Sequence, residues 1–348
     1  MLLFATACKI PQTPSENKKD IDVQIVFYNV ENLFDTIDAE GKWDEEFTPG
    51  GAKKWDTQKY QTKLLNLASV IDSIGQNRLP DIIGLEEVEN RAVLEDLVNQ
   101  EALKKAQYSI IHYESPDFRG IDNALLYKSD VFEVIHKQAI PVTMPKEIEL
   151  IGDHALTTRD HLYVKGILHR TDTLHLFVNH WTSMYYGEEE TIPHRNYCAQ
   201  VLRYYVDSIF EKNPNANIVI GGDLNEDVFA QAYLQHLKAD TVFDPIQNNR
   251  LYNLSYPLFT LKGKGTYNFR GEWGVLDHII VSGALLNKVN PTFTKIDWAH
   301  TFDSDLVMNY YNNRHGKGKR PNRSYGGDNY YGGFSDHLPV YLNLKIIL

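Results

Sequence analysis

Short apolar runs rich in β-branched and aromatic residues recur along the chain and predict buried strands. They cover residues 23–28, 80–90, 108–112, 123–127, 162–169, 173–179, 217–220, 274–282 and a last segment that begins near residue 339. Between them, apolar residues at helical spacing predict helices over residues 58–75, 91–105 and 194–211. This alternation of strands and helices predicts an α/β protein.

Polar segments separate these elements and are predicted to be loops. The longest are residues 35–56, 184–193 and 309–333, and a shorter one covers residues 115–122. No internal repeat and no linker interrupts the middle of the chain. We therefore expect one domain over residues 21–348, preceded by a flexible tether at residues 1–20.

Polar side chains gather where the predicted strands end. The stretch IGGDLNED at residues 220–227 is the clearest case, because positions i and i+2 of an extended segment point to one side and would place Asp223 beside Asn225. The other strand-end groups are Asn29 with Glu31, Glu86 with Glu87, His180, Asp277, and Asp336 with His337. Each group alone is compatible with a solvated turn, but ligand sites of α/β sheets form at strand ends. Together they predict a site.

Seven motifs in this order carry a resemblance to a known family. They are NVEN (29–32), GLEEVEN (84–90), RGIDNALLY (119–127), VNHW (178–181), GGDLNED (221–227), LDHIIVS (276–282) and SDHLPV (335–340). The series resembles the endonuclease/exonuclease/phosphatase (DNase I-like) superfamily from about residue 23 to residue 344. That superfamily includes DNase I-like nucleases, abasic-site endonucleases, sphingomyelinases and inositol polyphosphate phosphatases. The resemblance implies a four-layer α/β sandwich, with two mixed sheets face to face and helices outside.

The resemblance also implies a divalent metal, Mg²⁺ with Mn²⁺ as a substitute, held by carboxylates. Glu87 matches the family's principal metal ligand, and Glu31 and Asp336 match further metal or site acids. Mg²⁺ prefers oxygen ligands and keeps several waters, so one or two carboxylates are sufficient.

The same matching implies the catalytic and phosphate-binding residues. Asp223 matches the acid that positions or deprotonates the attacking water, and His337 matches the histidine beside the phosphate, oriented by Asp277. His180 matches a histidine that acts as an acid or a phosphate contact. Asn29, Asn225 and, more loosely, Arg159 match phosphate-binding positions. The expected reaction is in-line attack by water on a phosphodiester, without a covalent intermediate.

Charge and composition limit the substrate only partly. The 348 residues are 43% hydrophobic and carry a net charge of −11, which argues against non-specific coating of DNA but not against an enzyme with a local basic groove. The segment 309–333 supplies such a basic run, with tyrosines between the charges: Arg314, Lys317, Lys319, Arg320 and Arg323. It is predicted either to grip phosphates and stack bases or to form a solvated surface loop. The acidic run at 188–190 would repel a polyanion.

Three functions remain after this reasoning. The first is a phosphodiesterase of the nuclease-like branch. The second is a phosphatase or sphingomyelinase-like hydrolase of small or lipid phosphoesters. The third is a non-catalytic binding module, which has no need for a water-positioning acid such as Asp223. No protein partner is implied, and we expect a monomer.

The N-terminal segment MLLFATACKI predicts the cellular location. An apolar run that ends in small residues before Cys8 resembles the end of a bacterial lipoprotein signal, so we expect an extracytoplasmic protein with a membrane tether through Cys8; a disordered N-terminus is the alternative. The second cysteine, Cys198, falls on the apolar stripe of a predicted helix and is expected to be buried. Two cysteines cannot form a zinc cluster.

Overall fold

Two seven-stranded sheets form the centre of the computed structural model, which describes residues 20–76, 78–151, 154–313 and 316–348. The first sheet has the order β16-β22-β1-β2-β4-β3, and β17 also pairs with β22. Its strands are β1 (Ile21–Leu33), β2 (Ile82–Val88), β3 (Ser109–His112), β4 (Asp122–Tyr127), β16 (Thr292–Phe293), β17 (Ala299–Thr301) and β22 (Val340–Ile346). The predicted tether with Cys8, and Arg314, lie outside the described residues.

The second sheet has the order β11-β12-β15-β10-β9-β8-β5. Its strands are β5 (Phe132–Ile140), β8 (His161–Leu168), β9 (Asp172–His180), β10 (Asn217–Asp223), β11 (Ala239–Asp240), β12 (Leu251–Asn253) and β15 (Asp277–Ser282). Parallel and antiparallel pairs occur in both sheets: β1 runs parallel to β2 and antiparallel to β22, and β10 runs parallel to β9 and antiparallel to β15.

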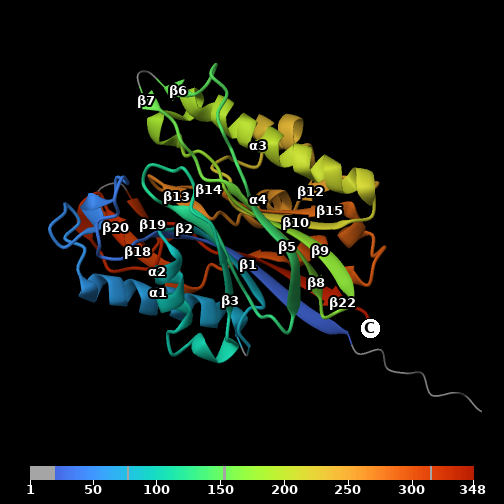
Figure 1. Ribbon diagram of the computed structural model, residues 1–348, viewed down its shortest axis with the longest axis horizontal. Helices are drawn as coiled ribbons and strands as arrows, with labels where there is room; N and C mark the ends of the chain where they lie inside the picture. Colours follow the sequence, from blue (N-terminus) through green and yellow to red (C-terminus); the bar gives the residue numbers. More distant parts are fainter. Residues whose placement is uncertain (1–19, 77, 152–153, 314–315) are drawn as a thin grey trace, which may run out of the picture.

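Helices cover the outer faces of the two sheets (Figure 1). Helices α1 (Thr57–Gly75) and α2 (Arg91–Val98) pack outside the first sheet, whereas α3 (Glu188–Lys212) and the π-helical segment Ala232–Leu237 pack outside the second. Shorter helical pieces are α4 (Ser255–Lys262), α5 (Gly283–Leu286) and the 3-10 turns Glu45–Phe47, Lys104–Ala106, Met184–Tyr186, Ile296–Trp298 and Asp305–Val307. The predicted four-layer α/β sandwich is confirmed.

Strand β1 shows how the sequence builds these layers. Its side chains alternate between two faces, as the pleat of a strand requires. Ile25 and Phe27 enter the apolar layer between the two sheets, whereas Val26 and Tyr28 enter the layer beneath α1. A third apolar layer separates the second sheet from α3 and includes the fully buried Cys198, as predicted.

The glycine pair of IGGDLNED lets the two sheets approach closely beside the end of β10. A Cβ on Gly221 would lie 2.3 Å from the ring of Phe27, so only glycine accommodates that ring here. Gly222 has a φ of 119°, and a Cβ there would lie 2.2 Å from the carbonyl oxygen of Asn179. The close approach brings the end of β1 next to the end of β10.

Two helix boundaries differ from the prediction. Helix α3 begins at Glu188 rather than near residue 194, with Pro193 inside it. The acidic run at 188–190 starts the helix, where carboxylates interact favourably with the helix dipole, and the hydroxyl of Thr191 donates to the carbonyl of Gly187. Helix α2 ends at Val98, before the predicted residue 105, and a 3-10 turn follows at Lys104–Ala106.

The segment 309–333, predicted as a loop, instead contains two hairpins. Strands β18 (Met308–Asn313) and β19 (Gly316–Pro321) form the first, and β20 (Tyr325–Gly326) and β21 (Asn329–Tyr330) the second. Tyr311 lies opposite Gly318, whose missing side chain leaves room for the tyrosine ring. Two further hairpins are β6–β7 (Leu150–Ile151, His154–Ala155) and β13–β14 (Tyr267–Phe269, Glu272–Gly274). No helix in the described ranges is both long and apolar enough to cross a membrane.

Candidate active site

Strand register places three of the predicted site residues in one row. Asp223, the last residue of β10, pairs with His180 at the end of β9 and with Asp277 at the start of β15. Strand pairing alone therefore brings their side chains together, at one end of these three neighbouring strands. All three are buried.

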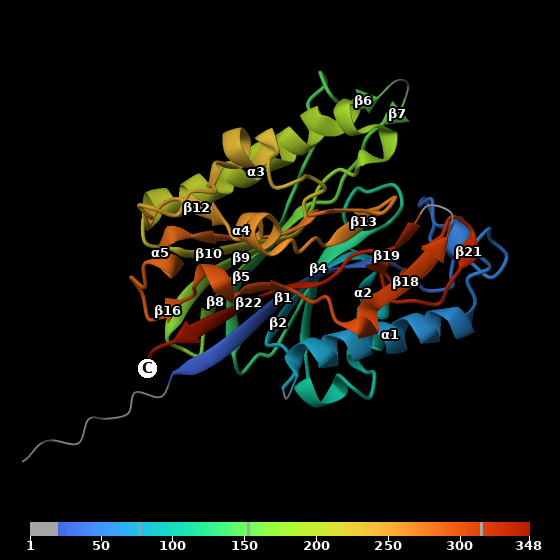
Figure 2. The same cartoon turned by 180° about the vertical axis from the view of Figure 1, so that it is seen from behind.

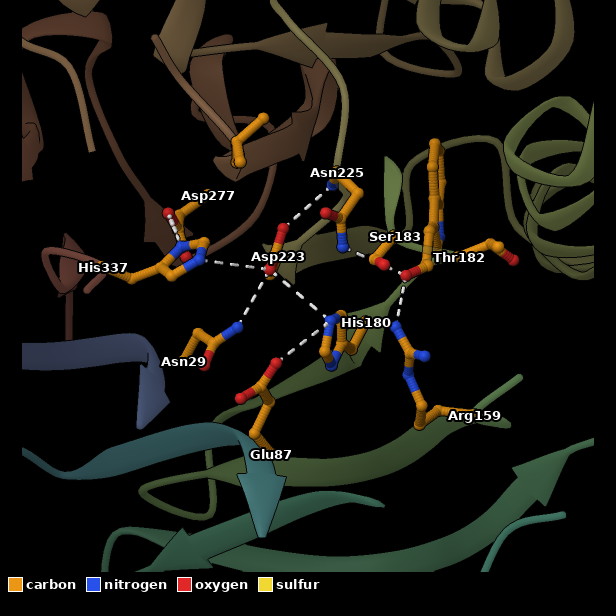
Figure 3. A network of polar contacts seen from close by, with 12 residues as sticks. Asn29, Glu87, Arg159, His180, Thr182, Ser183, Asp223, Asn225, Asp277 and His337 are labelled. Carbon is orange, nitrogen blue, oxygen red and sulfur yellow. Dashed lines mark hydrogen bonds and ion pairs between the residues drawn. The ribbon is translucent and has the colours of Figure 1, made fainter. Parts of the chain in front are cut away.

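The first sheet contributes two residues to the same place (Figure 3). Asn29, near the end of β1, donates from Nδ2 to Oδ2 of Asp223 over 2.9 Å. Glu87 lies at a bulge of β2, where its φ of 63° turns the side chain so that Oε1 lies 3.8 Å from Nε2 of His180. Asp223 is thus held from both sheets.

A tight turn after β10, rather than strand alternation, places Asn225. The strand ends at Asp223, whose Oδ1 accepts a hydrogen bond of 2.9 Å from the backbone N–H of Asn225. The Asn225 side chain then donates from Nδ2 to the carbonyl of Trp181 over 3.1 Å. Asp223 and Asn225 are neighbours, as predicted. The prediction assumed an extended strand, whereas a turn holds them together.

His337 reaches the network from the loop before β22. Its Nδ1 is 2.8 Å from Oδ2 of Asp277, and its Nε2 is 3.7 Å from Oδ2 of Asp223. Ser335 fixes this loop, because its hydroxyl donates to the carbonyl of Asn29 over 2.7 Å and accepts from the backbone N–H of His337 over 3.1 Å. Asp277 can therefore set the tautomer of His337 while Nε2 faces Asp223.

Arg159 contacts the network on the side of His180, away from His337 (Figure 3). Its side chain is buried, pairs with Asp117 over 3.1 Å and donates to the carbonyl of Trp181, the same carbonyl that Asn225 contacts. Its Nε is buried and has no hydrogen-bond partner among the described residues. Arg159 thus joins the network through the backbone between His180 and Thr182.

Glu31 and Asp336 have other contacts. Both oxygens of the buried Glu31 carboxylate accept backbone N–H groups, from Ser324 over 2.6 Å and from Tyr325 over 3.0 Å. Lys63 lies 4.0 Å from the same carboxylate. Asp336 lies 3.5 Å from Arg323. The metal roles of these two acids stay predictions, and the contacts of Glu31 leave it poorly suited to one.

Burial and neighbouring charges adjust the protonation of the Asp223–His337 pair. Burial raises the pKa of Asp223 to about 7, with His337 acting in the opposite direction. For His337, burial lowers the pKa, but the charges of Asp277 and Asp223 outweigh it and hold the pKa well above its usual value. Near neutral pH the site therefore contains an imidazolium next to a carboxyl group that readily exchanges a proton.

His180 has the opposite character. Burial, followed by the positive charge of Arg159, lowers the pKa of His180 well below its usual value. A neutral imidazole can donate one N–H to a phosphate oxygen but holds no spare proton. Of the two roles that the resemblance implied, this electrostatic environment favours the phosphate contact over the acid.

Glu86 was grouped with Glu87 among the predicted strand-end residues, but no role of its own was predicted for it. It is fully buried, and neither carboxylate oxygen has a hydrogen-bond partner among the described residues. Burial, with the charges of Asp277 and Asp223, raises the pKa of Glu86 well above its usual value. A protonated Glu86 adds no negative charge beside Asp223. Its position next to Glu87 was visible in the sequence, but its burial was not.

The donor set suits a divalent cation at one position. Glu87 uses Oε2 to accept the backbone N–H of Asn32 over 2.9 Å, while Oε1 accepts no hydrogen bond from the described residues and faces the network. A carboxylate oxygen of this kind is a suitable ligand for Mg²⁺.

A second group of possible metal ligands consists of His112, Glu114 and Asp122, whose ligand atoms lie within 4.8 Å of one another. His112 and Asp122 already form a hydrogen bond of 2.9 Å with each other.

Two hollows lie next to the network, one at Arg159 and the other near His337. One, of about 370 Å³, is lined by Arg159, Thr182 and Ser183 together with the exposed rings of Trp43 and Tyr185. The other, of about 920 Å³, is lined by Tyr267 and Arg323 among others, and the Tyr267 ring centroid lies 4.9 Å from that of His337. The first hollow therefore meets the network at Arg159, and the second meets it at Tyr267 beside His337.

Comparison with known families decides the assignment. A model described as the Endonuclease/Exonuclease/phosphatase family matches residues 24–346. The chain belongs to this family. Hydrolysis of phosphoester bonds is the chemistry that nucleases and phosphatases share, so this family member is a phosphoester hydrolase. The predicted resemblance is confirmed. A search of curated proteins gives no significant match.

Solved structures share the fold at low sequence identity. An endonuclease/exonuclease/phosphatase family protein from Bacteroides thetaiotaomicron has a TM-score of 0.54 and 17% identity, covering 95% of this chain and 100% of its own. D. rerio TDP2 complexed with a single-strand DNA product has a TM-score of 0.53 and 14% identity, covering 93% and 98%. The B. thetaiotaomicron mannosyl-6-phosphatase Bt3783 has a TM-score of 0.52 and 17% identity, covering 92% and 99%. These likenesses support the fold and leave the substrate open.

Proposed function

We propose that this family member is a divalent-metal-dependent phosphodiesterase of the nuclease type, which cleaves its substrate by in-line attack of water. The observation that carries the proposal is the position of the catalytic network between two hollows. A phosphodiester has a substituent on each side of the phosphorus, whereas a monoester needs space on one side only. A hollow at Arg159 and another at Tyr267 beside His337 therefore favour a diester.

The proposed roles follow from the contacts and the pKa directions. Asp223, with a pKa near 7, orients the attacking water and accepts its proton. His337, held as an imidazolium by Asp277, donates from Nε2 to a phosphoryl oxygen that becomes more negative in the transition state. Asn29 keeps the Asp223 carboxylate in place, and the neutral His180 donates an N–H to another phosphoryl oxygen.

Glu87 would hold the cation through Oε1. When bound, a divalent ion supplies positive charge to the phosphoryl oxygens and so stabilises the transition state. The proposal also includes a monomeric state, together with the extracytoplasmic location and the tether through Cys8; the motif before Cys8 supports the last two.

Hydrolysis of bis-p-nitrophenyl phosphate with Mg²⁺ tests the proposal. We expect turnover that a chelator abolishes and Mg²⁺ or Mn²⁺ restores. Asp223→Asn should lower kcat by about 10²–10⁴-fold, the usual contribution of a general base. The control Asp227→Asn removes a nearby carboxyl group whose contact is a local turn with Phe229, and it should leave kcat within about twofold.

Two outcomes would contradict the mechanism, and two others would contradict the proposed substrate. Full activity in chelator would exclude the metal, and equal rates for Asp223→Asn and the wild type would exclude the base. A preference for p-nitrophenyl phosphate over the diester would instead identify a monoester phosphatase, and cleavage of sphingomyelin but not of nucleic acid a lipid phosphodiesterase.

A further inference from the structure

The larger hollow is a positively charged surface on an acidic protein. It lies between the hairpins β13–β14 and β18–β19, which occupy the same end of the molecule, with β13 against β19 (Figure 2). Its lining includes four cationic side chains, Arg270, Lys317, Arg320 and Arg323, but one carboxylate, Glu272. The whole chain carries a net charge of −11, so this concentration of positive charge runs against the general composition.

Two buried donors in the lining lack acceptors. Asn268, which is 8% exposed, uses Oδ1 to accept the backbone N–H of Gly271 over 3.2 Å, but its Nδ2 has no hydrogen-bond partner among the described residues. The same is true of Nε of Arg320. Buried polar groups in folded proteins are nearly always paired, so these two donors are available to an acceptor that enters the hollow.

The wall of the hollow is a packed structure. The Tyr311 ring lies against Gly318, where a Cβ would come within 2.5 Å of the tyrosine hydroxyl oxygen. The Arg320 guanidinium lies 5.9 Å from the centre of the same ring. At the inner end, the Tyr267 ring contacts that of His337. The Tyr267 ring thus joins the wall of this hollow to His337.

We infer that this hollow is a subsite for a second phosphate of the substrate, next to the phosphate that is hydrolysed. The inference rests on the proposed function and adds a substrate class: phosphodiesters that carry a neighbouring phosphate. Guanidinium and amide groups donate to phosphate oxygens in a geometry that suits this anion. The partly exposed ring of Phe269 and the ring of Tyr311 offer faces for stacking a base between the two phosphates.

The predicted basic run at 309–333 sends some of its side chains into this hollow and others away from it. Lys317, Arg320 and Arg323 line the hollow, whereas Lys319 lies 3.6 Å from Asp305 and covers the Tyr310 ring. Only part of the run therefore faces the substrate. Arg270 joins it from the other hairpin, from a different part of the sequence.

A pair of matched substrates tests the inference. Thymidine 5′-(p-nitrophenyl phosphate) and the same compound with an added 3′-phosphate have the same leaving group and differ by one phosphate. We expect the wild type to prefer the bisphosphate by about tenfold or more in kcat/KM, the effect of one or two charge-assisted hydrogen bonds. In the double variant Arg270→Gln/Lys317→Gln, whose two side chains are exposed, the ratio should fall toward one.

The matched control is Arg170→Gln/Lys288→Gln, which removes the same charges from exposed positions outside the hollow and should keep the wild-type ratio. Inhibition by a short oligothymidylate and by thymidine 3′,5′-bisphosphate then distinguishes a polynucleotide from a small bisphosphate; tighter inhibition by either one supports the subsite. A wild-type ratio near one, or an unchanged ratio in Arg270→Gln/Lys317→Gln, would overturn the inference while leaving the phosphodiesterase proposal intact.

A binding measurement separates the two proposals if no substrate is cleaved. Fluorescence anisotropy of a labelled short oligothymidylate is measured in chelator with the wild type and both double variants. Binding that weakens about tenfold or more in Arg270→Gln/Lys317→Gln but not in the control supports the subsite even without turnover. Equal binding by all three proteins would overturn it.

Discussion

Asp223 obtains its properties from both sheets at once. Strand pairing places it between His180 and Asp277, and the Asn29 side chain fixes its carboxylate from the other sheet. The sequence pattern predicted this grouping, because each polar group stands where an apolar strand ends, and the family resemblance supplied the expected roles. The strand pattern did not include the local turn that holds Asn225, and it could not supply the burial of Glu86, which depends on how closely the two sheets pack.

At the residue scale, Asp277 is expected to act through His337. Among the charges that raise the pKa of His337, Asp277 comes first, so Asp277→Asn should lower that pKa. Because the rate requires the imidazolium, activity is lost as pH rises through this pKa, and in the variant the loss should begin at lower pH. We also expect kcat to fall by roughly 10²–10⁴-fold. A pH–rate profile of kcat measures both effects. An alkaline limb at the wild-type position would show that Asp277 does not set the charge of His337.

At the element scale, the connection between β19 and β20 depends on a buried carboxylate. Glu31 accepts the backbone N–H groups of Ser324 and Tyr325, while the buried Lys63 donates to the Ser324 hydroxyl and to the carbonyl of Phe334. The sequence predicted a basic loop here but not the hairpins, because their positions depend on contacts with residues near the start of the chain. The metal role that the resemblance implied for Glu31 stays a prediction, whereas its contacts with Ser324 and Tyr325 were not visible in the sequence.

Glu31→Gln distinguishes the two roles. The glutamine amide would place N–H against a backbone N–H, so the free energy of unfolding should fall by about 1–3 kcal/mol, while the Mg²⁺ concentration for half-maximal rate stays unchanged. Glu87→Gln is the matched control, with the opposite pattern: a higher Mg²⁺ requirement and little change in stability. Denaturant unfolding in chelator and Mg²⁺ titration of the rate measure the two quantities. A raised Mg²⁺ requirement in Glu31→Gln would restore its role as a metal ligand.

At the scale of the whole molecule, two sets of buried groups oppose each other as pH changes. The layered core isolates several histidines and carboxyl groups from water. Burial lowers the pKa of His161 and of His278 to about 4. Burial raises the pKa of Glu89 to about 8 and that of Glu86 well above its usual value. The sequence placed apolar strands around these residues but did not show which polar side chains the layers would enclose.

These shifts predict that stability is greatest at mildly acidic pH. The histidines are neutral in the folded protein and take up protons more readily when unfolded, so their contribution is lost as pH falls from about 6.5 to about 4. The carboxyl groups are protonated in the folded protein and ionise more readily when unfolded, so stability is lost as pH rises from about 4.5 to about 8. The melting temperature in chelator should therefore peak between about pH 4.5 and 6.5. Glu86→Gln, which cannot ionise, should raise the melting temperature at pH 8 more than at pH 5. Equal changes at both values would show that Glu86 is ionised in the folded protein.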